Sequence, residues 1–260
     1  MSRPAGAAPA DLAPSETSLL EVSDLRKSYG ERVVLADVDL VVRPHDVVCL
    51  IGSSGSGKST LLRCLNLLED IDDGVIRFDG REISDPRVDR RAVRSRMGMV
   101  FQAYNLFPHL TVLENCTLAP RRVHGLSRAE AEARARALLE QFGLSDQAGK
   151  HPDRLSGGQQ QRAALVRALC TSPTLLLLDE ITAALDPELV GEVLTIVRDL
   201  AEQGTTMILA THEMSFAREV ATSVCFLHEG RILEQGPPDQ ILTAPREART
   251  RQFLRRVLPG

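Results

Sequence analysis

The sequence has no run of apolar residues close to the ~20 that a membrane-spanning helix needs. It also lacks the apolar core of a secretory signal, because its opening residues, MSRPAGAAPADLAPSET, are dominated by Ala and Pro. We therefore predict a disordered tail over residues 1–17. The rest, 18–260, is expected to form one soluble, cytosolic domain that is long enough to bury a sizeable core.

Paired cysteines are missing as well. The five cysteines stand singly, without the spacing of a zinc site or of a disulfide framework, at positions 49, 64, 116, 170 and 225. We expect small buried hydrophobes in a reducing compartment. With 31 basic and 35 acidic residues and a net charge of -4, the composition gives no reason to expect nucleic acid as a partner. Lysine is scarce. Of the 31 basic residues only Lys27, Lys58 and Lys150 are lysine, and the rest are arginine.

Four apolar segments predict the fold class. VVLADVDLVV (33–42) alternates like a half-exposed antiparallel strand, whereas VVCLI (47–51) is continuously apolar, like a strand buried on both faces. TLLLL (174–178) and TTMILA (205–210) are of the second kind, and a helical pattern precedes each. Buried strands separated by helices indicate an α/β domain with a mainly parallel sheet.

Two further segments predict helices. SRAEAEARARALLEQFGL begins with a plausible N-cap at Ser127 and ends at Gly143, so we place a helical subdomain at about 104–150. The C-terminal segment PREARTRQFLRRVL (245–258) reads as an amphipathic basic helix. Such a helix either packs on the domain with a solvated arginine face or contacts lipid.

The strongest motif follows the buried strand 47–51 directly. GSSGSGKST, the phosphate loop (52–60), has the spacing G-x-x-x-x-G-K-S and leads into LLRCLNLL, a predicted helix. Triphosphate oxygens must be met by several backbone N–H groups at once, and glycines let the loop wrap tightly around them. The bland alternative is a glycine-rich turn with an incidental lysine. The candidate phosphate-binding residues are Gly52, Ser53, Ser54, Gly55, Ser56, Gly57, Lys58, Ser59 and Thr60.

Polar residues end two of the other buried strands. Asp179 and Glu180 follow LLLL, and His212 ends TTMILATH. At the carboxyl end of a parallel sheet such side chains open into the ligand crevice. Asp179 and Ser59 suit Mg²⁺, Glu180 suits the activation of a water molecule, and His212 suits a γ-phosphate contact. Acids after an apolar run also occur in helix-capping turns, and a lone strand-end histidine is often structural.

One more stretch, RLSGGQQQRAAL (154–165), starts a helix with two glycines and three glutamines but offers no acid or base. With the other motifs in the same order, it resembles the ATP-binding subunits of ABC transporters from about Leu19 to Leu258. The set that carries the resemblance is Tyr29, GSSGSGKST, Gln102 in MVFQAYNLFPHLTVLEN, LSGGQQQR, LLLLDE, ALDPE and His212. The resemblance implies a P-loop NTPase core, an antiparallel β subdomain and an inserted α-helical subdomain.

The resemblance also implies the use of the unexplained stretch. In that family two subunits pair head to tail, and the signature loop LSGGQ (155–159) of one covers the nucleotide of the other. The residues implied as a lid carried in trans are Ser156, Gly157, Gly158 and Gln159.

The same family logic implies ATP and Mg²⁺ as the bound groups and assigns roles to three further residues. Tyr29 would stack on adenine, Gln102 would sense the γ-phosphate and Mg²⁺, and Asp186 would link the two sites. Tyr29 could instead only pack on a strand edge, and Gln102 could be an ordinary loop residue. The implied metal-binding set is Ser59, Gln102 and Asp179.

The chain departs from the family pattern after its acid pair. Where the family has Pro-Thr-Ser, this chain has Ile181, Thr182 and Ala183. Ala183 removes a hydroxyl from the loop that faces the partner subunit. The departure bears on communication between the two sites and not on nucleotide binding.

The lengths of two segments and the sequences of two others indicate which branch of the family the chain resembles. The stretch between Gln102 and the signature loop is too short for the coiled coil of a DNA-repair type, and the end of the chain is too short for an added regulatory domain. The sequences MGMVFQAYNLFPHLTVLENCTLAP and THEMSFAREVA look most like those of the polar amino-acid uptake branch.

The resemblance therefore implies an ATPase on the cytoplasmic face of the cell membrane. It would act as a homodimer, or paired with a similar ATPase subunit, on separate permease subunits and indirectly with a solute-binding protein. The alternative is the stand-alone ATPase of an exporter, or a non-transport ABC ATPase.

Overall fold

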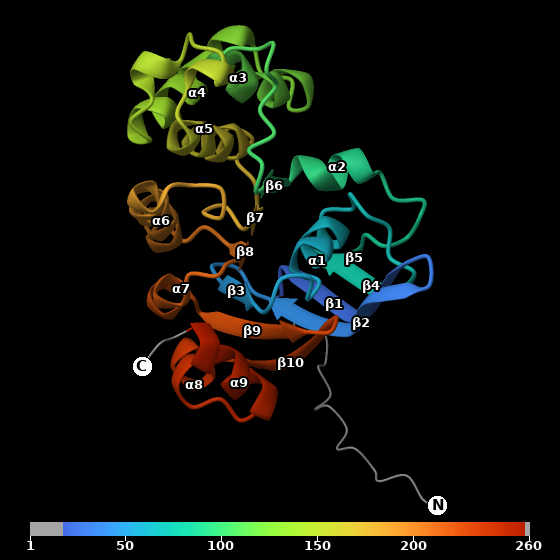
Figure 1. Ribbon diagram of the computed structural model, residues 1–260. Helices are drawn as coiled ribbons and strands as arrows, with labels where there is room; N and C mark the ends of the chain where they lie inside the picture. Colours follow the sequence, from blue (N-terminus) through green and yellow to red (C-terminus); the bar gives the residue numbers. More distant parts are fainter. Residues whose placement is uncertain (1–17, 258–260) are drawn as a thin grey trace, which may run out of the picture.

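The computed structural model describes residues 18–257 (Figure 1). The predicted tail, 1–17, lies outside the described residues, as do 258–260. Within 18–257 no helix combines the length and the apolar character that crossing a bilayer would require.

A six-stranded sheet forms the centre of the molecule, in the order β10-β9-β3-β8-β7-β6. Four of its five strand pairings are parallel, and the fifth joins β10 antiparallel to β9. This mainly parallel sheet confirms the predicted fold class. The strands are β3 (Val47–Ile51), β6 (Met97–Val100), β7 (Leu175–Asp179), β8 (Met207–Ala210), β9 (Ser223–His228) and β10 (Arg231–Gly236).

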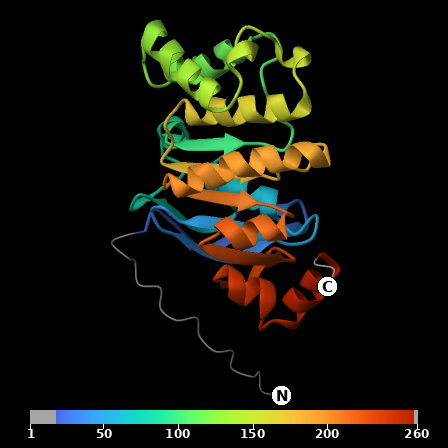
Figure 2. The same ribbon diagram turned by 90° about the vertical axis from the view of Figure 1, so that its left-hand side faces the viewer.

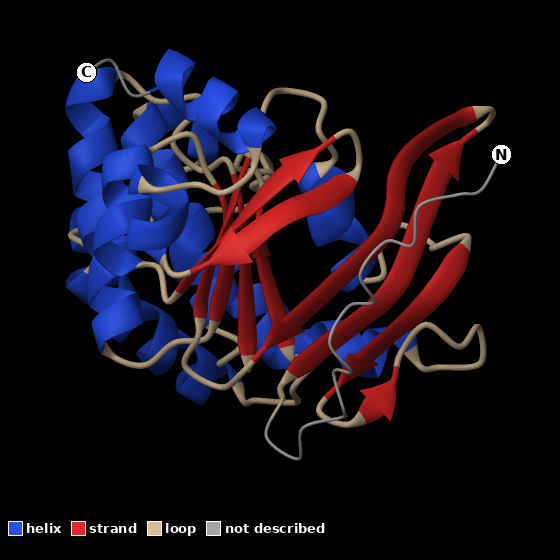
Figure 3. Cartoon of the chain, turned by 90° about the horizontal axis from the view of Figure 1, so that it is seen from below, coloured by secondary structure: helices blue, strands red, loops and turns tan. Residues whose placement is uncertain are grey.

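A second, antiparallel sheet lies beside the first, in the order β2-β1-β4-β5. Figure 3 shows its long strands next to the central strands, with most of the helices gathered on the other side of the molecule. The alternating segment 33–42 falls within one of these strands. Four of its apolar residues are buried, and Val33 at its start is exposed; the buried four are Leu35, Val38, Leu40 and Val42. The strands are β1 (Leu20–Tyr29), β2 (Arg32–Val42), β4 (Asp73–Phe78) and β5 (Arg81–Glu82).

Two apolar cores fill the two faces of the central sheet. Along β3, Cys49 and Ile51 point into one core, while Val48 and Leu50 point into the other. A strand covered on both sides has no solvent face, which is why its sequence is continuously apolar. All five cysteines are buried free thiols, and burial raises the pKa of Cys64 to about 12, so that this thiol stays protonated.

A helical layer covers one end of the central sheet (Figures 1 and 2). Its three α-helices begin at capping boxes, in which the side chains of the N-cap and of the third helical residue each bond the other's backbone N–H. The last helix packs on the other two, so the layer continues past residue 150. The elements are α3 (Val112–Arg122), α4 (Arg128–Gln141), the 3-10 turns Ser145–Gln147 and Pro152–Arg154, and α5 (Gly157–Leu169).

The remaining helices flank the two sheets. Those that matter below are α1, which follows the phosphate loop, α6, which follows the acid pair, and α9, the basic helix expected from the sequence. Their bounds are α1 (Lys58–Leu65), α2 (Arg90–Ser95), α6 (Pro187–Glu202), α7 (Met214–Val220), α8 (Pro238–Thr243) and α9 (Ala248–Val257).

Candidate functional site

The phosphate loop joins the carboxyl end of β3 to the first turn of α1, and two of its glycines are sterically required. A Cβ on Gly52, at φ +152°, would lie 2.2 Å from the carbonyl oxygen of Leu227. On Gly57, at φ +110°, it would lie 2.8 Å from a methyl group of Leu35. The loop therefore wraps so closely against neighbouring chain at these two positions that a side chain is excluded. Of its backbone N–H groups, that of Ser56 donates to the carbonyl oxygen of Ser53 at 3.1 Å.

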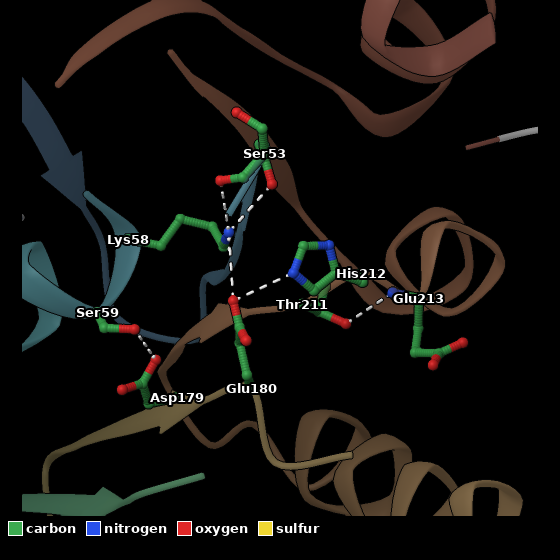
Figure 4. Close-up of polar contacts among 9 residues, drawn as sticks. Ser53, Lys58, Ser59, Asp179, Glu180, Thr211, His212 and Glu213 are labelled. Atoms are coloured by element: carbon green, nitrogen blue, oxygen red, sulfur yellow. Dashed lines mark hydrogen bonds and ion pairs between the residues drawn. The ribbon is translucent and has the colours of Figure 1, made fainter. Parts of the chain in front are cut away.

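Lys58, the first residue of α1, lies over this loop with only 4% of its surface exposed. Its ammonium donates to the carbonyl oxygens of Gly52, at 3.0 Å, and Ser53, at 3.3 Å (Figure 4). A carboxylate oxygen of Glu180 lies 3.2 Å from the same nitrogen. The buried charge is thus held by two carbonyls and one counter-charge, as a buried lysine requires.

The hydroxyl of Ser59 donates to Asp179 Oδ1 at 2.7 Å, which joins the start of α1 to the end of β7. Asp179 is 3% exposed, and burial raises the pKa of its carboxyl; the Ser59 hydrogen bond acts in the opposite direction and the charge of Glu180 adds to the rise. A hydroxyl and a carboxylate oxygen are hard ligands that suit Mg²⁺. Across residues 18–257 no group of three or more His, Cys, Asp or Glu side chains is placed to hold a metal without other ligands.

Glu180 and His212 meet at the ends of the neighbouring strands β7 and β8. His212 Nε2 lies 3.1 Å from Glu180 Oε1, the oxygen that also faces Lys58 (Figure 4). Glu180 has φ +45°, in the left-handed region that residues other than glycine rarely occupy. Such strained residues cluster at active sites. Among residues 18–257 the second carboxylate oxygen, Oε2, has no hydrogen-bond or ion-pair partner, so it is able to accept a proton.

These groups surround an open hollow of about 330 Å³, the phosphate-loop hollow. The hollow brings together most of the predicted loop residues with Gln102 and Glu180, and it adds Arg32 and Val34, which the sequence reasoning missed. Their only signal in the sequence is proximity to Tyr29, because Arg32 pairs with Tyr29 across the β1–β2 hairpin. The lining residues are Arg32, Val34, Ser54, Gly55, Gly57, Lys58, Ser59, Thr60, Gln102 and Glu180.

Two further features fit a nucleotide ligand, one in the phosphate loop and one at the end of β1. The buried hydroxyl of Ser56 has no hydrogen-bond partner within the described chain. Tyr29, at the hairpin beside the hollow, is 46% exposed, with the Lys27 ammonium 5.1 Å from its ring centroid. Partial burial, followed by the charge of Glu69, raises the pKa of Tyr29, which keeps the ring a neutral stacking surface.

The signature loop lies elsewhere, since none of its residues lines the phosphate-loop hollow. Ser156 is the N-cap of α5: its hydroxyl oxygen accepts the Gln159 N–H at 3.3 Å, and Gln159 Oε1 accepts the Ser156 N–H at 3.1 Å. A hydroxyl that accepts in this way keeps its own hydrogen for donation. The sequence reasoning missed this capping box, although the S-x-x-Q spacing signals it.

The loop after the acid pair packs beside the signature loop. A Cβ on Gly157 would lie 3.7 Å from a methyl group of Leu185, and one on Gly158 would lie 3.1 Å from Leu189. Asp186 is exposed at the start of α6, and its side chain makes no capping bond there. The predicted site residues therefore fall into two groups on one chain, one at the phosphate loop and one at the signature loop.

Of the residues that depart from the family pattern, Ile181 lies in the core and Ala183 lies at the surface. Ile181 is 3% exposed and belongs to the apolar core, which accounts for an apolar residue there. Ala183 is exposed, and its backbone N–H donates to the carbonyl of Glu180 at 3.0 Å. The missing hydroxyl thus changes only the surface of this turn.

Comparison with known proteins identifies these features together. The family described as ABC transporter matches residues 35–183. The glutamine transport ATP-binding protein GlnQ of Escherichia coli is 48% identical over 239 residues, which cover 92% of this chain and all of that protein. The histidine transport ATP-binding protein HisP of Pseudomonas aeruginosa is 51% identical, with 90% of this chain and 97% of that protein covered.

A solved structure matches as well. The ATP-binding cassette MJ0796, determined as a dimer in a post-hydrolysis state with ADP and Pi, superposes with a TM-score of 0.78 at 32% identity. The match covers 84% of this chain and 98% of that one.

Proposed function

The chain belongs to the ABC transporter family, and from this premise we propose that it is the ATP-hydrolysing subunit of a membrane importer for polar amino acids. The observation that carries the ATPase assignment is the contact of Glu180 with both Lys58 and His212 at the edge of the phosphate-loop hollow. The importer assignment is supported by relatives named for glutamine and histidine transport at about half identity over nearly the whole chain.

ATP would place its phosphates against the backbone N–H groups of the phosphate loop, at the positive end of α1. Lys58 would then turn its ammonium toward the β- and γ-oxygens, a short movement because it already lies over the loop. Ser59, Asp179 and Gln102 are the residues that would hold Mg²⁺. When bound, that ion neutralises phosphate charge and orients the oxygens.

Glu180 would position the attacking water and accept its proton at Oε2, the oxygen that faces neither Lys58 nor His212. His212 would keep the carboxylate oriented through Oε1 and would reach the γ-phosphate with its ring. Tyr29 would stack on the adenine at the outer edge of the hollow. Each step uses a group that lies at or beside the phosphate-loop hollow.

The signature loop would act on the nucleotide of a second copy. The absence of signature-loop residues from the lining of the phosphate-loop hollow in the same chain supports this arrangement, as does the dimeric state named for the MJ0796 cassette. The Ser156 hydroxyl hydrogen and the N–H groups at the start of α5 would contact the γ-phosphate in trans. Hydrolysis would then remove the group that joins the two halves, so closure would depend on a difference in affinity between the ATP and ADP states.

A mixing experiment tests the composite site. Lys58→Ala and Ser156→Ala proteins should each hydrolyse ATP poorly. In a mixed head-to-tail dimer both lesions fall in one composite site and leave the other intact, so random mixing should restore about a quarter of the wild-type rate. No recovery on mixing, with each variant shown to be folded and dimeric, would contradict the trans arrangement.

The transport role needs a different experiment. The chain would dock peripherally on permease subunits at the cytoplasmic face of the membrane, with a solute-binding protein joining on the other side. Affinity purification from native membranes, followed by identification of the retained proteins, should yield a permease and a binding protein. A membrane partner without a binding protein would favour export, and recovery of no membrane protein would remove transport from the assignment.

A further inference from the structure

The C-terminal helix α9 is held firmly on the central sheet. The Phe253 ring packs on Phe226 of β9 with ring centroids 5.1 Å apart. The buried carboxylate of Glu234, on β10, accepts the backbone N–H groups of Arg246 at 2.7 Å and Glu247 at 3.2 Å, just before the helix begins. Side chains on α9 are therefore presented in fixed directions, and the helix is part of the folded domain.

Two of its arginines face the phosphate loop. Arg249 and Arg256 line a small hollow of about 140 Å³, the arginine hollow, together with His228 and with Ser53 of the phosphate loop. Arg255, the neighbour of Arg256, lies on the other side of the helix and lines a different hollow. The two sides of one helix thus offer a matched pair of adjacent arginines, only one of which is near the nucleotide.

The arginine hollow carries excess positive charge. Arg249 donates to the Gln252 amide oxygen at 3.0 Å, and neither it nor Arg256 forms an ion pair with any residue in 18–257. One carboxylate is near, since Glu229 Oε1 lies 3.7 Å from His228 Nε2. Two guanidinium groups facing a hollow with one carboxylate at its edge would accept a further carboxylate.

The chain carries an exposed carboxylate in the right relation to the signature loop. Glu188 lies in the first turn of α6 and has no ion pair within the described part of the chain. Leu185, just before α6, and Leu189, in its first turn, lie beside the signature loop, where a Cβ on Gly157 or Gly158 would be 3.7 Å or 3.1 Å from them. Where the signature loop of a second copy approaches a phosphate loop, Glu188 of that copy approaches with it.

We propose that Arg249 and Arg256 form an ion pair with Glu188 of a second copy when the ATP-bound dimer closes. The two-fold symmetry of such a dimer repeats the pair, so each closure makes two of them. The inference rests on the head-to-tail arrangement of the proposed function and adds a new contact to it. It gives the basic face of α9 a protein partner and a direct part in closure.

The first test compares neighbouring arginines. In a Glu180→Gln background, where slow hydrolysis preserves the γ-phosphate, ATP-dependent dimerisation is measured by sedimentation at about 0.05 M and about 0.5 M salt. Arg256→Glu should weaken the dimer about three- to thirtyfold at low salt, since two exposed ion pairs are replaced by repulsion, and much less at high salt. Arg255→Glu changes the same charge on the other side of α9 and should leave the dimer constant within about twofold.

The second test restores the charges by mixing. Arg256→Glu and Glu188→Arg proteins each place like charges together in their own homodimers. In the mixed dimer every reversed charge faces an opposite one, so ATP should drive heterodimers in preference to either homodimer. A statistical mixture, in which heterodimers make up about half of all dimers, would overturn the inference.

The outcomes separate the two levels of the argument. If the Glu180→Gln protein does not dimerise with ATP, the head-to-tail arrangement fails and the ion pair fails with it. If that protein dimerises but Arg256→Glu and Arg255→Glu behave alike, only the ion pair is overturned. Matching melting temperatures for the two arginine variants would show that neither result comes from unfolding.

Discussion

Two serines that cap helices in the same way allow structural and catalytic roles to be separated. Ser156 caps α5 and Ser127 caps α4, and each hydroxyl accepts the N–H of the third helical residue, at 3.3 Å and 3.2 Å. Loss of such a cap costs about 1 kcal/mol of unfolding free energy. For a chain of this size we expect both Ser→Ala variants to lose about 2–4 °C in melting temperature.

Only Ser156→Ala should also lose activity. The hydroxyl of Ser156 keeps a hydrogen that can be donated to the γ-phosphate of the second copy, and removal of one such donor lowers turnover by about 10²–10³-fold. Steady-state phosphate release, measured beside thermal unfolding, gives both quantities on the same samples. Ser127→Ala should hydrolyse ATP at the wild-type rate.

The reasoning is refuted if the two variants keep equal activity. In that case the Ser156 hydroxyl would be a helix cap alone, and the signature loop would act through its backbone or not at all. A much larger loss of stability in Ser156→Ala would also contradict the argument, because the two capping boxes have nearly the same geometry.

Three further predictions concern the phosphate loop and the acid pair beside it. Glu180→Gln should lower turnover by about 10²–10⁴-fold with ATP affinity retained, whereas Glu213→Gln, whose side chain points away from the cluster in Figure 4, should not, as phosphate release and nucleotide binding will show. Gly52→Ala should lower the unfolding free energy by about 2–5 kcal/mol, because its Cβ would meet a backbone oxygen at 2.2 Å. Gly55→Ala, with φ +76° and open space around it, should cost only about 1–2 kcal/mol; equal losses in denaturation would contradict the steric argument. Asp179→Asn should raise the melting temperature of the nucleotide-free protein at neutral pH while abolishing hydrolysis. The raised pKa of Asp179 makes the folded state bind more protons than the unfolded state above pH 3.8. This carboxyl therefore lowers the stability of the folded protein as pH rises. The increase in melting temperature of the variant should accordingly shrink as pH falls toward 3.8.

The parallel core was the part of the fold that the sequence predicted best. Continuous apolar runs such as 47–51 signal a strand covered on both faces, and the two cores packed against β3 supply that cover. Three strands of the same sheet were not predicted. β9 contains the apolar run VCFL, which is buried on both faces like β3 and carries the same local signal. β6 is only four residues long and β10 is largely exposed, so these two become strands because the sheet beside them offers hydrogen bonds, a cause that no local pattern contains.

The helical layer shows a related limit. Ser127 and Gly143 predicted the bounds of α4 to within two residues, because both are local signals. The membership of α5 in the same layer depends on which helices it packs against, and sequence alone placed the upper limit of the layer near 150. Packing partners far apart in the chain decide such limits.

The site residues differ in how much of their position the local sequence determines. The phosphate loop lies within one strand, turn and helix, so spacing alone predicts its shape. Asp179 and His212 come near it only because β8 lies beside β3, and β7 beside β8, in a parallel sheet, which the strand pattern made expected but did not prove. The proposed role of Ser156 depends on more than the fold of one chain, because its proposed ligand is held by another molecule. A helix cap explains its geometry completely within one chain, so only an experiment that combines two chains can show whether it has a second role.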